Sequence, residues 1–168
     1  LVITWGTAWV YRYTRENIVV SNCHKIPSQE FERSRLSVED IVKEYLVLIG
    51  RLREINPGLR ILFTVSPIRH WKDGAHGNQL SKATLLLAID RLREELQHVY
   101  YFPAYEIVLD ELRDYRFYAD DMLHMSGFTV DYIWERFLYS FISPEVLGLM
   151  NQIGRVNKGV AHRPFDPQ

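Results

Sequence analysis

An aspartate and a histidine stand three residues apart in the segment YADDMLHMSG, where Asp121 precedes His124. A histidine acting as a general base presents one ring nitrogen to the nucleophile, while an acceptor on the other nitrogen fixes its tautomer and stabilises the cation. A carboxylate three residues earlier can reach that second nitrogen. The spacing also fits a structural role, in which Asp121 caps the following turn and His124 is a partly buried packing residue. The pair is therefore a candidate for acid–base chemistry whose context must decide between the two roles.

The elements that must position this pair follow from the periodicity of the apolar residues. Short apolar runs predict strands, and longer runs with three- and four-residue spacing predict helices. The strands are expected at residues 1–4, 17–20, 59–66 and 99–102, and the helices at 38–55, 82–97, 105–113, 128–141 and from 144 onward. Ser37, Ser81 and Ser143 are the predicted N-caps, with Asp40 completing a capping box with Ser37.

Strands that are apolar on both faces and alternate with amphipathic helices indicate a parallel sheet covered on both sides. Functional groups of such folds gather in loops at the carboxyl ends of the strands. This rule selects four segments, which are residues 6–8, 21–24, 67–70 and 121–124.

Composition limits the classes of function. The 168 residues, 47% of them hydrophobic, suffice for one domain, which we place at residues 1–156 with a polar tail at 157–168. A net charge of -1 gives no electrostatic case for nucleic-acid binding. No apolar stretch is long enough to span a bilayer, and Cys23 is the only cysteine, so a reducing compartment is compatible. We expect a soluble, cytoplasmic protein without a cofactor.

Several blocks of the sequence resemble known hydrolases. The segment DDMLHMSGFTVDYIWERF is similar to the last block of the SGNH, or GDSL-type, hydrolases, in which Asp-x-x-His precedes the final helix. LVITWGTAW resembles their strand-plus-Gly-x-Asn block, and IVKEYLVLIGRLREINPGLRILFTVSP resembles their helix, turn and strand. More closely, GTAWVY, NCHK, VSPIRHWKDG and YFPAYEIVLDELRDYRFYADDMLH together resemble the GSCFA family, a bacterial branch of that superfamily.

The resemblance extends to about residue 141 and implies a three-layer α/β/α fold with a mainly parallel, flavodoxin-like sheet. It also implies a Ser-His-Asp esterase mechanism, with His124 as the base and Asp121 as the residue that orients it. The sequence contains no Gly-Asp-Ser, Gly-Ser-Cys or Gly-x-Ser-x-Gly motif. The nucleophilic serine and the first strand are therefore expected in a segment preceding Leu1. Ala8 stands where the superfamily carries an asparagine.

Other residues in the selected loops are candidates for binding. Gly6 and Asn22 could donate hydrogen bonds to an oxyanion, although a glycine that ends a strand and an asparagine that closes a turn have structural roles too. Arg69 and His70 could contact an anionic or polar part of an ester substrate, which the superfamily draws from small molecules, carbohydrates and lipids. Cys23 and His24 are neighbours on an extended segment and point to opposite faces, which argues against a Cys-His mechanism.

Three functions remain open at this point. The chain is the larger part of a serine ester hydrolase, a non-catalytic binding domain on a hydrolase scaffold, or a metal-dependent hydrolase. The third would collect ligands from separate loops, namely His24, His70, His76 and His124, but their spacing matches no compact zinc motif, so we expect no metal. If the chain is complete, the free edge of its first strand should be hidden, for example in a homodimer.

Overall fold

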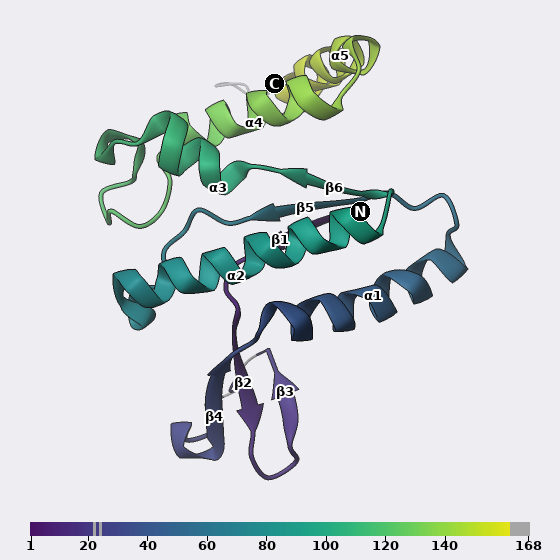
Figure 1. The fold of residues 1–168 in the computed structure, drawn as a ribbon. Coiled ribbons are helices and arrows are strands. Elements are labelled where there is room, and N and C mark those ends of the chain that lie inside the picture. Colours follow the sequence, from purple (N-terminus) through teal and green to yellow (C-terminus); the bar gives the residue numbers. More distant parts are fainter. Residues whose placement is uncertain (22, 24, 162–168) are drawn as a thin grey trace, which may run out of the picture.

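The computed structural model describes residues 1–21, 23 and 25–161, and a parallel sheet of three strands lies at its centre (Figure 1). The strands are β1 (Val2–Trp5), β5 (Ile61–Val65) and β6 (Val99–Phe102), and β5 lies between the other two. Ile3 pairs with Phe63 and Ile61 pairs with Val99, in parallel register. The predicted mixed α/β fold with a parallel sheet is confirmed.

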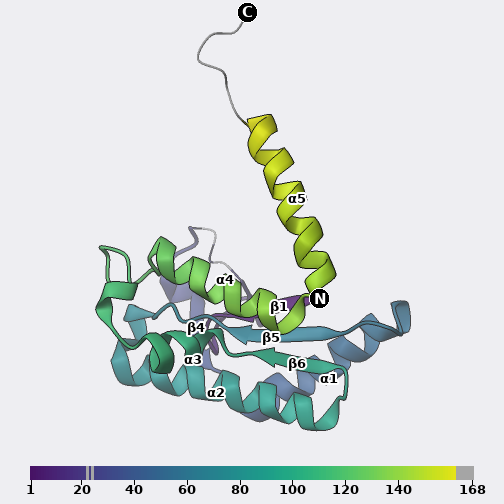
Figure 2. The ribbon, with the colours of Figure 1, turned by 90° about the horizontal axis from the view of Figure 1, so that it is seen from above.

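Helices cover both faces of this sheet and produce three layers (Figures 1 and 2). Helices α1 (Val38–Ile55) and α2 (Gly74–Glu95) form one outer layer, while the short α3 (Ala104–Glu106), a π-helical turn (Ile107–Leu112) and α4 (Gly127–Phe141) form the other. The alternation along β5 reflects this arrangement. Its odd-numbered residues join the main hydrophobic core, which includes residues of α1 and α2, whereas Leu62 packs in a smaller cluster with residues of α4.

The helix ends follow the expected local chemistry. At the start of α1, the Ser37 hydroxyl accepts a hydrogen bond from the Asp40 N–H, and the Asp40 carboxylate accepts one from the Ser37 N–H. The predicted capping box is therefore present. Helix α5 (Pro144–Ala161) begins at the predicted proline and points away from the three layers (Figure 2). It continues past residue 157, where we expected the tail to begin, because Val156 and Val160 extend the helical spacing of its apolar residues.

A small antiparallel sheet forms an arm beside the three layers (Figure 1). It consists of β2 (Trp9–Tyr13), β3 (Ile18–Val20) and β4 (Phe31–Arg35), in the order β3-β2-β4. The strand predicted at residues 17–20 is β3, so its assignment to the parallel sheet was wrong. Asn17 has a left-handed backbone (φ 55°), and the tight turn that it closes sends β3 back along β2. Strands β2 and β4 were not predicted.

The start of α2 also differs from the prediction. Ser81 was the expected N-cap, but the helix begins at Gly74, seven residues earlier, and Ser81 is buried inside it. The polar first turns of this helix are held by tertiary contacts. For example, the Asn78 side chain accepts a hydrogen bond from the His70 N–H at 3.1 Å. Local sequence could not reveal these contacts, because they join segments that are separate in the chain.

Three short 3-10 turns complete the described residues, at Ser28–Glu30, Trp71–Asp73 and Tyr115–Phe117. No helix in the part of the chain that the structure describes is long and apolar enough to cross a membrane.

Candidate active site

The Asp121–His124 segment is the tip of a loop that leads into α4. Tyr118 and Met125 form an isolated antiparallel bridge at its base. The Ala119 N–H donates to the His124 carbonyl at 2.8 Å, and the Ser126 N–H donates to the Phe117 carbonyl at 3.0 Å. The loop is therefore closed by its own backbone hydrogen bonds.

Helix α4 anchors the same loop from the other side. The Ser126 hydroxyl caps the helix by accepting a hydrogen bond from the Thr129 N–H at 3.3 Å. Thr129 is fully buried, and its hydroxyl donates to the Phe117 carbonyl at 2.6 Å. Because Phe117 belongs to the base of the loop, the first turn of α4 holds that base in place.

Within the loop, Asp121 binds His124 through both carboxylate oxygens. Oδ2 lies 2.5 Å from the His124 Nδ1, and Oδ1 accepts the backbone N–H groups of Leu123 at 2.9 Å and of His124 at 2.8 Å. The hydrogen bond from the His124 ring, followed by those from the two N–H groups, lowers the pKa of Asp121 from 3.8 to about 2. The carboxylate is therefore ionised at neutral pH and orients the imidazole.

This geometry determines which nitrogen of His124 can act as a base. A carboxylate only accepts hydrogen bonds, so Nδ1 carries the proton that it donates to Asp121. In the neutral ring, Nε2 is then unprotonated and can accept a proton. The side chains of His124 and Asp121 are 61% and 49% exposed, so the pair lies at the surface of the protein.

His124 lines an apolar hollow of about 720 Å³ between the sheet and α4. Three of the lining residues, Ser66, Pro67 and Ile68, directly follow β5, which places the histidine beside the carboxyl end of the central strand. Segments 67–70 and 121–124 thus lie near each other, and segment 6–8 directly follows β1 of the same sheet. Ser21 instead follows β3 of the arm, so the expectation that segment 21–24 follows a strand of the parallel sheet was wrong. Apolar residues of the sheet and of α4 supply most of the remaining walls, among them Val2, Leu62, Phe102, Ile133 and Phe137.

Arg69 links the segment that follows β5 to the Asp121–His124 loop. Its guanidinium donates to the Tyr118 hydroxyl at 3.0 Å and to the Tyr115 hydroxyl at 3.4 Å, and lies over both rings. Tyr118 also forms the bridge at the base of the His124 loop. Arg69 thus connects the segment that follows β5 to that base.

His70 and Gly6 lie together at the end of β1. A Cβ atom at residue 6 would lie 3.6 Å from the His70 Nε2, which is an ordinary van der Waals distance, so the imidazole lies directly beside the strand end. Burial, and then the neighbouring Lys82 charge, lower the pKa of His70. His70 is therefore neutral at neutral pH, and its ring can act there as a hydrogen-bonding group.

Lys82 is a buried residue that the sequence analysis did not identify as part of the site. It is 1% exposed, and its ammonium donates to the Gly6 carbonyl and to the Ser66 carbonyl, both at 2.6 Å. These are the first residues after β1 and β5, so one side chain joins the carboxyl ends of two strands. Burial lowers the pKa of Lys82 from 10.5 to about 8. Its position within a predicted amphipathic helix gave no sign of this role.

Ser81, the residue before Lys82, also bonds to the segment that follows β1. Its hydroxyl accepts the Ala8 N–H at 2.8 Å and contacts the Thr7 hydroxyl at 3.0 Å. It therefore holds the segment that leaves β1 for the arm. Ser81 was expected at the start of the helix, and its burial inside α2 depends on these distant contacts, so no local signal in the sequence located this junction.

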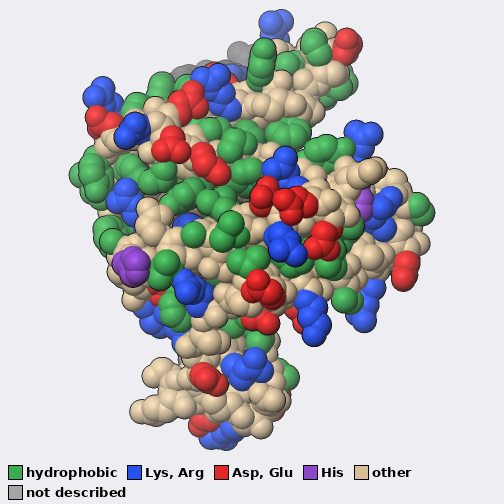
Figure 3. Space-filling model, in the orientation of Figure 1, with side chains coloured by type: hydrophobic (Ala, Val, Ile, Leu, Met, Phe, Trp, Pro, Cys, Tyr) green, Lys and Arg blue, Asp and Glu red, His purple; other side chains and the backbone are tan. Residues whose placement is uncertain are grey.

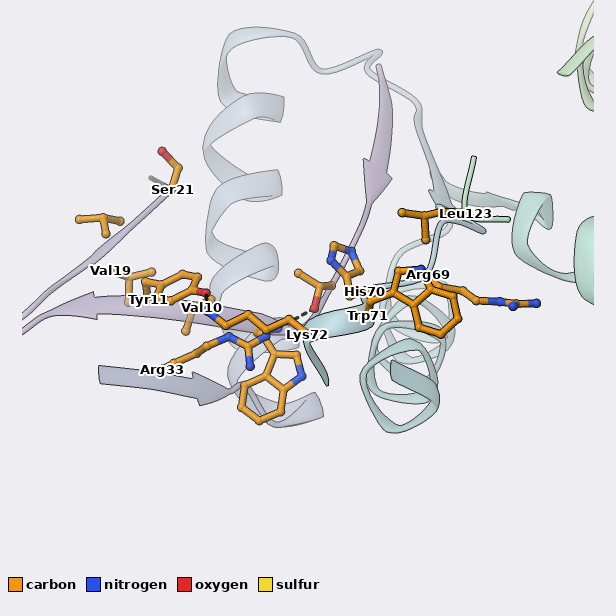
Figure 4. Close-up of a pocket in the computed structure, with 13 residues that line it drawn as sticks. Val10, Tyr11, Val19, Ser21, Arg33, Arg69, His70, Trp71, Lys72 and Leu123 are labelled. Carbon is orange, nitrogen blue, oxygen red and sulfur yellow. Dashed lines mark hydrogen bonds between the residues drawn. The ribbon is translucent and has the colours of Figure 1, made fainter. Parts of the chain in front are cut away.

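A second hollow, of about 660 Å³, lies between the arm and the segment that follows β5 (Figure 4). Arg69 and His70 both line it, and so does Leu123, the residue before His124. The Asp121–His124 loop thus contributes a wall residue to each hollow, His124 to the first and Leu123 to the second. Ser21 reaches this hollow from the end of β3, and Asn22 lies outside the described residues.

Of the four histidines considered as metal ligands, His24 lies outside the described residues and His76 is exposed on α2. Within residues 1–21, 23 and 25–161, no three His, Cys, Asp or Glu side chains gather in a way that could hold a metal ion. Cys23 is a free, half-buried thiol.

Comparison with known proteins gives one match. No curated protein and no solved structure matches the chain. The sequence model of the GSCFA family matches residues 1–137, which include both β-sheets, the two hollows and the Asp121–His124 loop. The chain therefore belongs to the GSCFA family.

Proposed function

We propose that Asp121 and His124 are the acid–base part of an SGNH-type ester hydrolase site. The observation that carries the proposal is the 2.5 Å contact between the Asp121 carboxylate and the His124 Nδ1, which leaves Nε2 as a base. The position of the pair beside the carboxyl end of β5 supports it, because ligands of open α/β sheets bind there. Membership of the GSCFA family supports it as well.

In the proposed reaction, His124 takes the proton of a serine hydroxyl while the serine oxygen bonds to the ester carbonyl carbon. Asp121 stabilises the imidazolium, which then gives its proton to the oxygen of the leaving alcohol. Water attacks the acyl-serine in the second half of the reaction, again with His124 as the base. The products are the free acid, the alcohol and the regenerated serine.

The nucleophile in this proposal is a serine outside the 168 residues of the chain. In the described residues, the only side chain hydrogen-bonded to the His124 ring is Asp121. Gly6 and Asn22 stay our candidates for oxyanion donors, and Arg69 and His70 our candidates for substrate contacts. The substrate class is an ester of a small molecule, a carbohydrate or a lipid.

A fluorophosphonate probe, which labels activated serines, tests the proposal. We expect labelling of the protein that carries the serine in addition to this chain, and no labelling of the 168-residue chain alone. Replacing His124 with Ala in the longer protein should lower ester hydrolysis about 10³-fold or more. Asp121→Asn should lower it about 10²-fold or more, because the imidazole loses its orienting carboxylate.

His76→Ala is the matched control, since this histidine is exposed on α2, and it should leave the rate unchanged. Retained hydrolysis in the His124→Ala variant would refute the assignment. Labelling of the 168-residue chain at Ser66, which lines the same hollow as His124, would place the nucleophile inside the chain and overturn that part of the proposal.

The second candidate is a non-catalytic binding domain. It is favoured by the absence of a serine hydroxyl bonded to the His124 ring in the part of the chain that the structure describes. Under this alternative, the fluorophosphonate probe labels neither the chain nor the longer protein.

A further inference from the structure

The hollow between the arm and the segment after β5 has a one-sided charge. Basic side chains line it, and none of its described lining residues is acidic. Lys72 and Arg33 lie close to Tyr11 on the side of the arm, while Arg69 points away from them (Figure 4). The aromatic rings of Trp9 and Trp71 complete the wall.

The two basic groups beside Tyr11 have different partners. Arg33 forms an ion pair with Asp73, whose side chain is 1% exposed, and stacks over the Trp9 ring at 4.3 Å. Lys72 donates to the Tyr11 hydroxyl at 2.6 Å, and no carboxylate pairs with it in the part of the chain that the structure describes. Because Asp73 balances Arg33, Lys72 is the basic group beside Tyr11 whose charge is left uncompensated.

Buried polar atoms without partners in the described residues also occur in this region. They are the indole N–H of Trp9, the Nε–H of Arg33 and the Oδ2 of Asp73. Arg33 and Asp73 already form an ion pair, so each can supply the other's missing partner, and the Trp9 indole N–H is the donor that still needs an acceptor. The positive charge of Lys72 together with this donor fits a ligand that carries anionic oxygens.

We propose that this hollow binds an anionic group, a carboxylate or a phosphate, through Lys72 and the indole N–H of Trp9. Leu123 lies on the wall of the hollow, next to His124 in sequence, so a ligand held here reaches toward the Asp121–His124 loop. That the ligand is the ester substrate rests on the proposed function, whereas the anion site itself does not. The substrate class that follows is an ester with a negatively charged group on one side of the scissile bond.

Binding of small aromatic anions to the 168-residue chain tests the site. We use benzoate and phenyl phosphate as carboxylate and phosphate probes, and benzamide as the neutral analogue of benzoate. The signals of the Trp9 and Trp71 indole N–H groups in proton–nitrogen correlation spectra report binding in the hollow. At least one of the two anions should shift these signals in a saturable way, and benzamide should bind about tenfold more weakly or not at all.

Lys72→Gln should weaken anion binding about tenfold, because the exposed side chain loses its charge without disturbing the core. Lys72→Arg should restore most of the affinity, and Lys43→Gln, at an exposed lysine of α1, is the matched control and should bind like the original chain. Tyr11→Phe removes the hydroxyl that accepts from Lys72 but keeps the charge, so its effect should be smaller than that of Lys72→Gln.

Equal binding of benzoate and benzamide, or an unchanged affinity in Lys72→Gln, would overturn the proposal. These outcomes do not depend on ester hydrolysis. If His124→Ala abolishes hydrolysis but the original chain binds no anion, the proposed function stands and the anion site is refuted. If the original chain binds the anion but His124→Ala keeps full activity, the anion site stands and the proposed function is refuted.

Discussion

The two faces of the parallel sheet are built differently. On the side of α1 and α2, the residues Ile61, Phe63 and Val65 of β5 are completely buried, and the core is continuous. On the side of α4, a smaller cluster surrounds Leu62 and Phe102, and an apolar hollow of about 720 Å³ remains open beside it. Hydrophobic side chains are visible at the surface around the layer of α3 and α4 in Figure 3.

Because of this difference, one face of the sheet should contribute most of the stability, while the other face carries the candidate site. Closely packed apolar side chains contribute most of the free energy of folding, so the face covered by α1 and α2 should dominate stability. The open face carries His124, and in the proposed reaction its Nε2 needs access to a substrate. Trp134 of α4 is 49% exposed although it lines the hollow, which shows how incompletely this face is covered. The following variants test the contrast between the two faces.

The largest effect is expected for Phe63→Ala on the closed face. Phe63 is 0% exposed, and its ring centroid lies 4.8 Å from that of Trp5 and 5.5 Å from that of Tyr45. The cavity should lower the free energy of unfolding by about 3–5 kcal/mol in chemical denaturation. Phe137→Ala on the open face is the counterpart. It should lower the free energy of unfolding by about half as much or less, because Phe137 is only half-buried.

Equal losses in the two variants would contradict the contrast between the faces. If Phe63→Ala does not fold, Phe63→Leu serves the same comparison with a smaller expected loss of about 1–2 kcal/mol.

The next effect concerns Lys82 and depends on pH. The unfolded chain keeps the Lys82 proton up to about pH 10.5, whereas the folded protein releases it near pH 8. Between these values the unfolded state binds more protons, so the stability of the protein rises with pH. Lys82→Met lacks this titration. The stability of the original chain relative to the variant should therefore increase by about 1–3 kcal/mol from pH 8 to pH 10.5.

Denaturation curves at several pH values measure this difference. Lys43→Met, at an exposed lysine of α1, is the control and should show no such dependence. A constant difference between Lys82→Met and the original chain across the same pH range would show that burial does not shift the Lys82 titration.

The sequence predicted the parts of the fold that depend on local patterns. Strands β1, β5 and β6 are short apolar runs, and the capping box of Ser37 and Asp40 marks the start of α1. These signals lie within a few neighbouring residues, so they can be recognised in one sequence. The loop that carries Asp121 and His124 could be identified for the same reason, since both partners and the following N-cap stand within six residues.

The parts that sequence analysis missed depend on contacts between distant residues. Lys82 bonds to carbonyls 76 and 16 residues away, and Ser81 bonds to the backbone 73 residues away. Nothing in the helical pattern of α2 indicates these partners. The arm was missed because β2 and β4 are half-buried along much of their length, without the clear alternation that marks a strand. As a result, the hollow next to the arm could not be predicted.

A smaller effect is expected for Thr129→Val, where α4 holds the His124 loop. Valine keeps the shape of the buried side chain but removes the hydrogen bond from its hydroxyl to the Phe117 carbonyl. We expect a loss of about 1 kcal/mol in the free energy of unfolding and faster amide hydrogen exchange in residues 118–126. Thr84→Val, at a half-buried threonine of α2 whose hydroxyl donates to the Leu80 carbonyl, should leave exchange in residues 118–126 unchanged and alter the free energy of unfolding by at most a few tenths of a kcal/mol. Unchanged exchange in the loop would show that Thr129 does not restrain it.

The smallest effect on global stability is expected from Asp121, because its contacts lie within one exposed loop. Its folded pKa of about 2 lies below the ordinary value of 3.8, so its hydrogen bonds are fully present above about pH 4 and are lost as the pH falls through about 2. The carboxyl carbon resonance of Asp121 should therefore still report an ionised group at pH 3. Asp121→Asn should accelerate amide exchange at Leu123 and His124, whose N–H groups bond to Oδ1, whereas Asp120→Asn, at the preceding exposed residue, should not. A midpoint near 3.8 for Asp121 would mean that the carboxylate does not hold the imidazole in solution, and His124 would then lack the orientation that a general base requires.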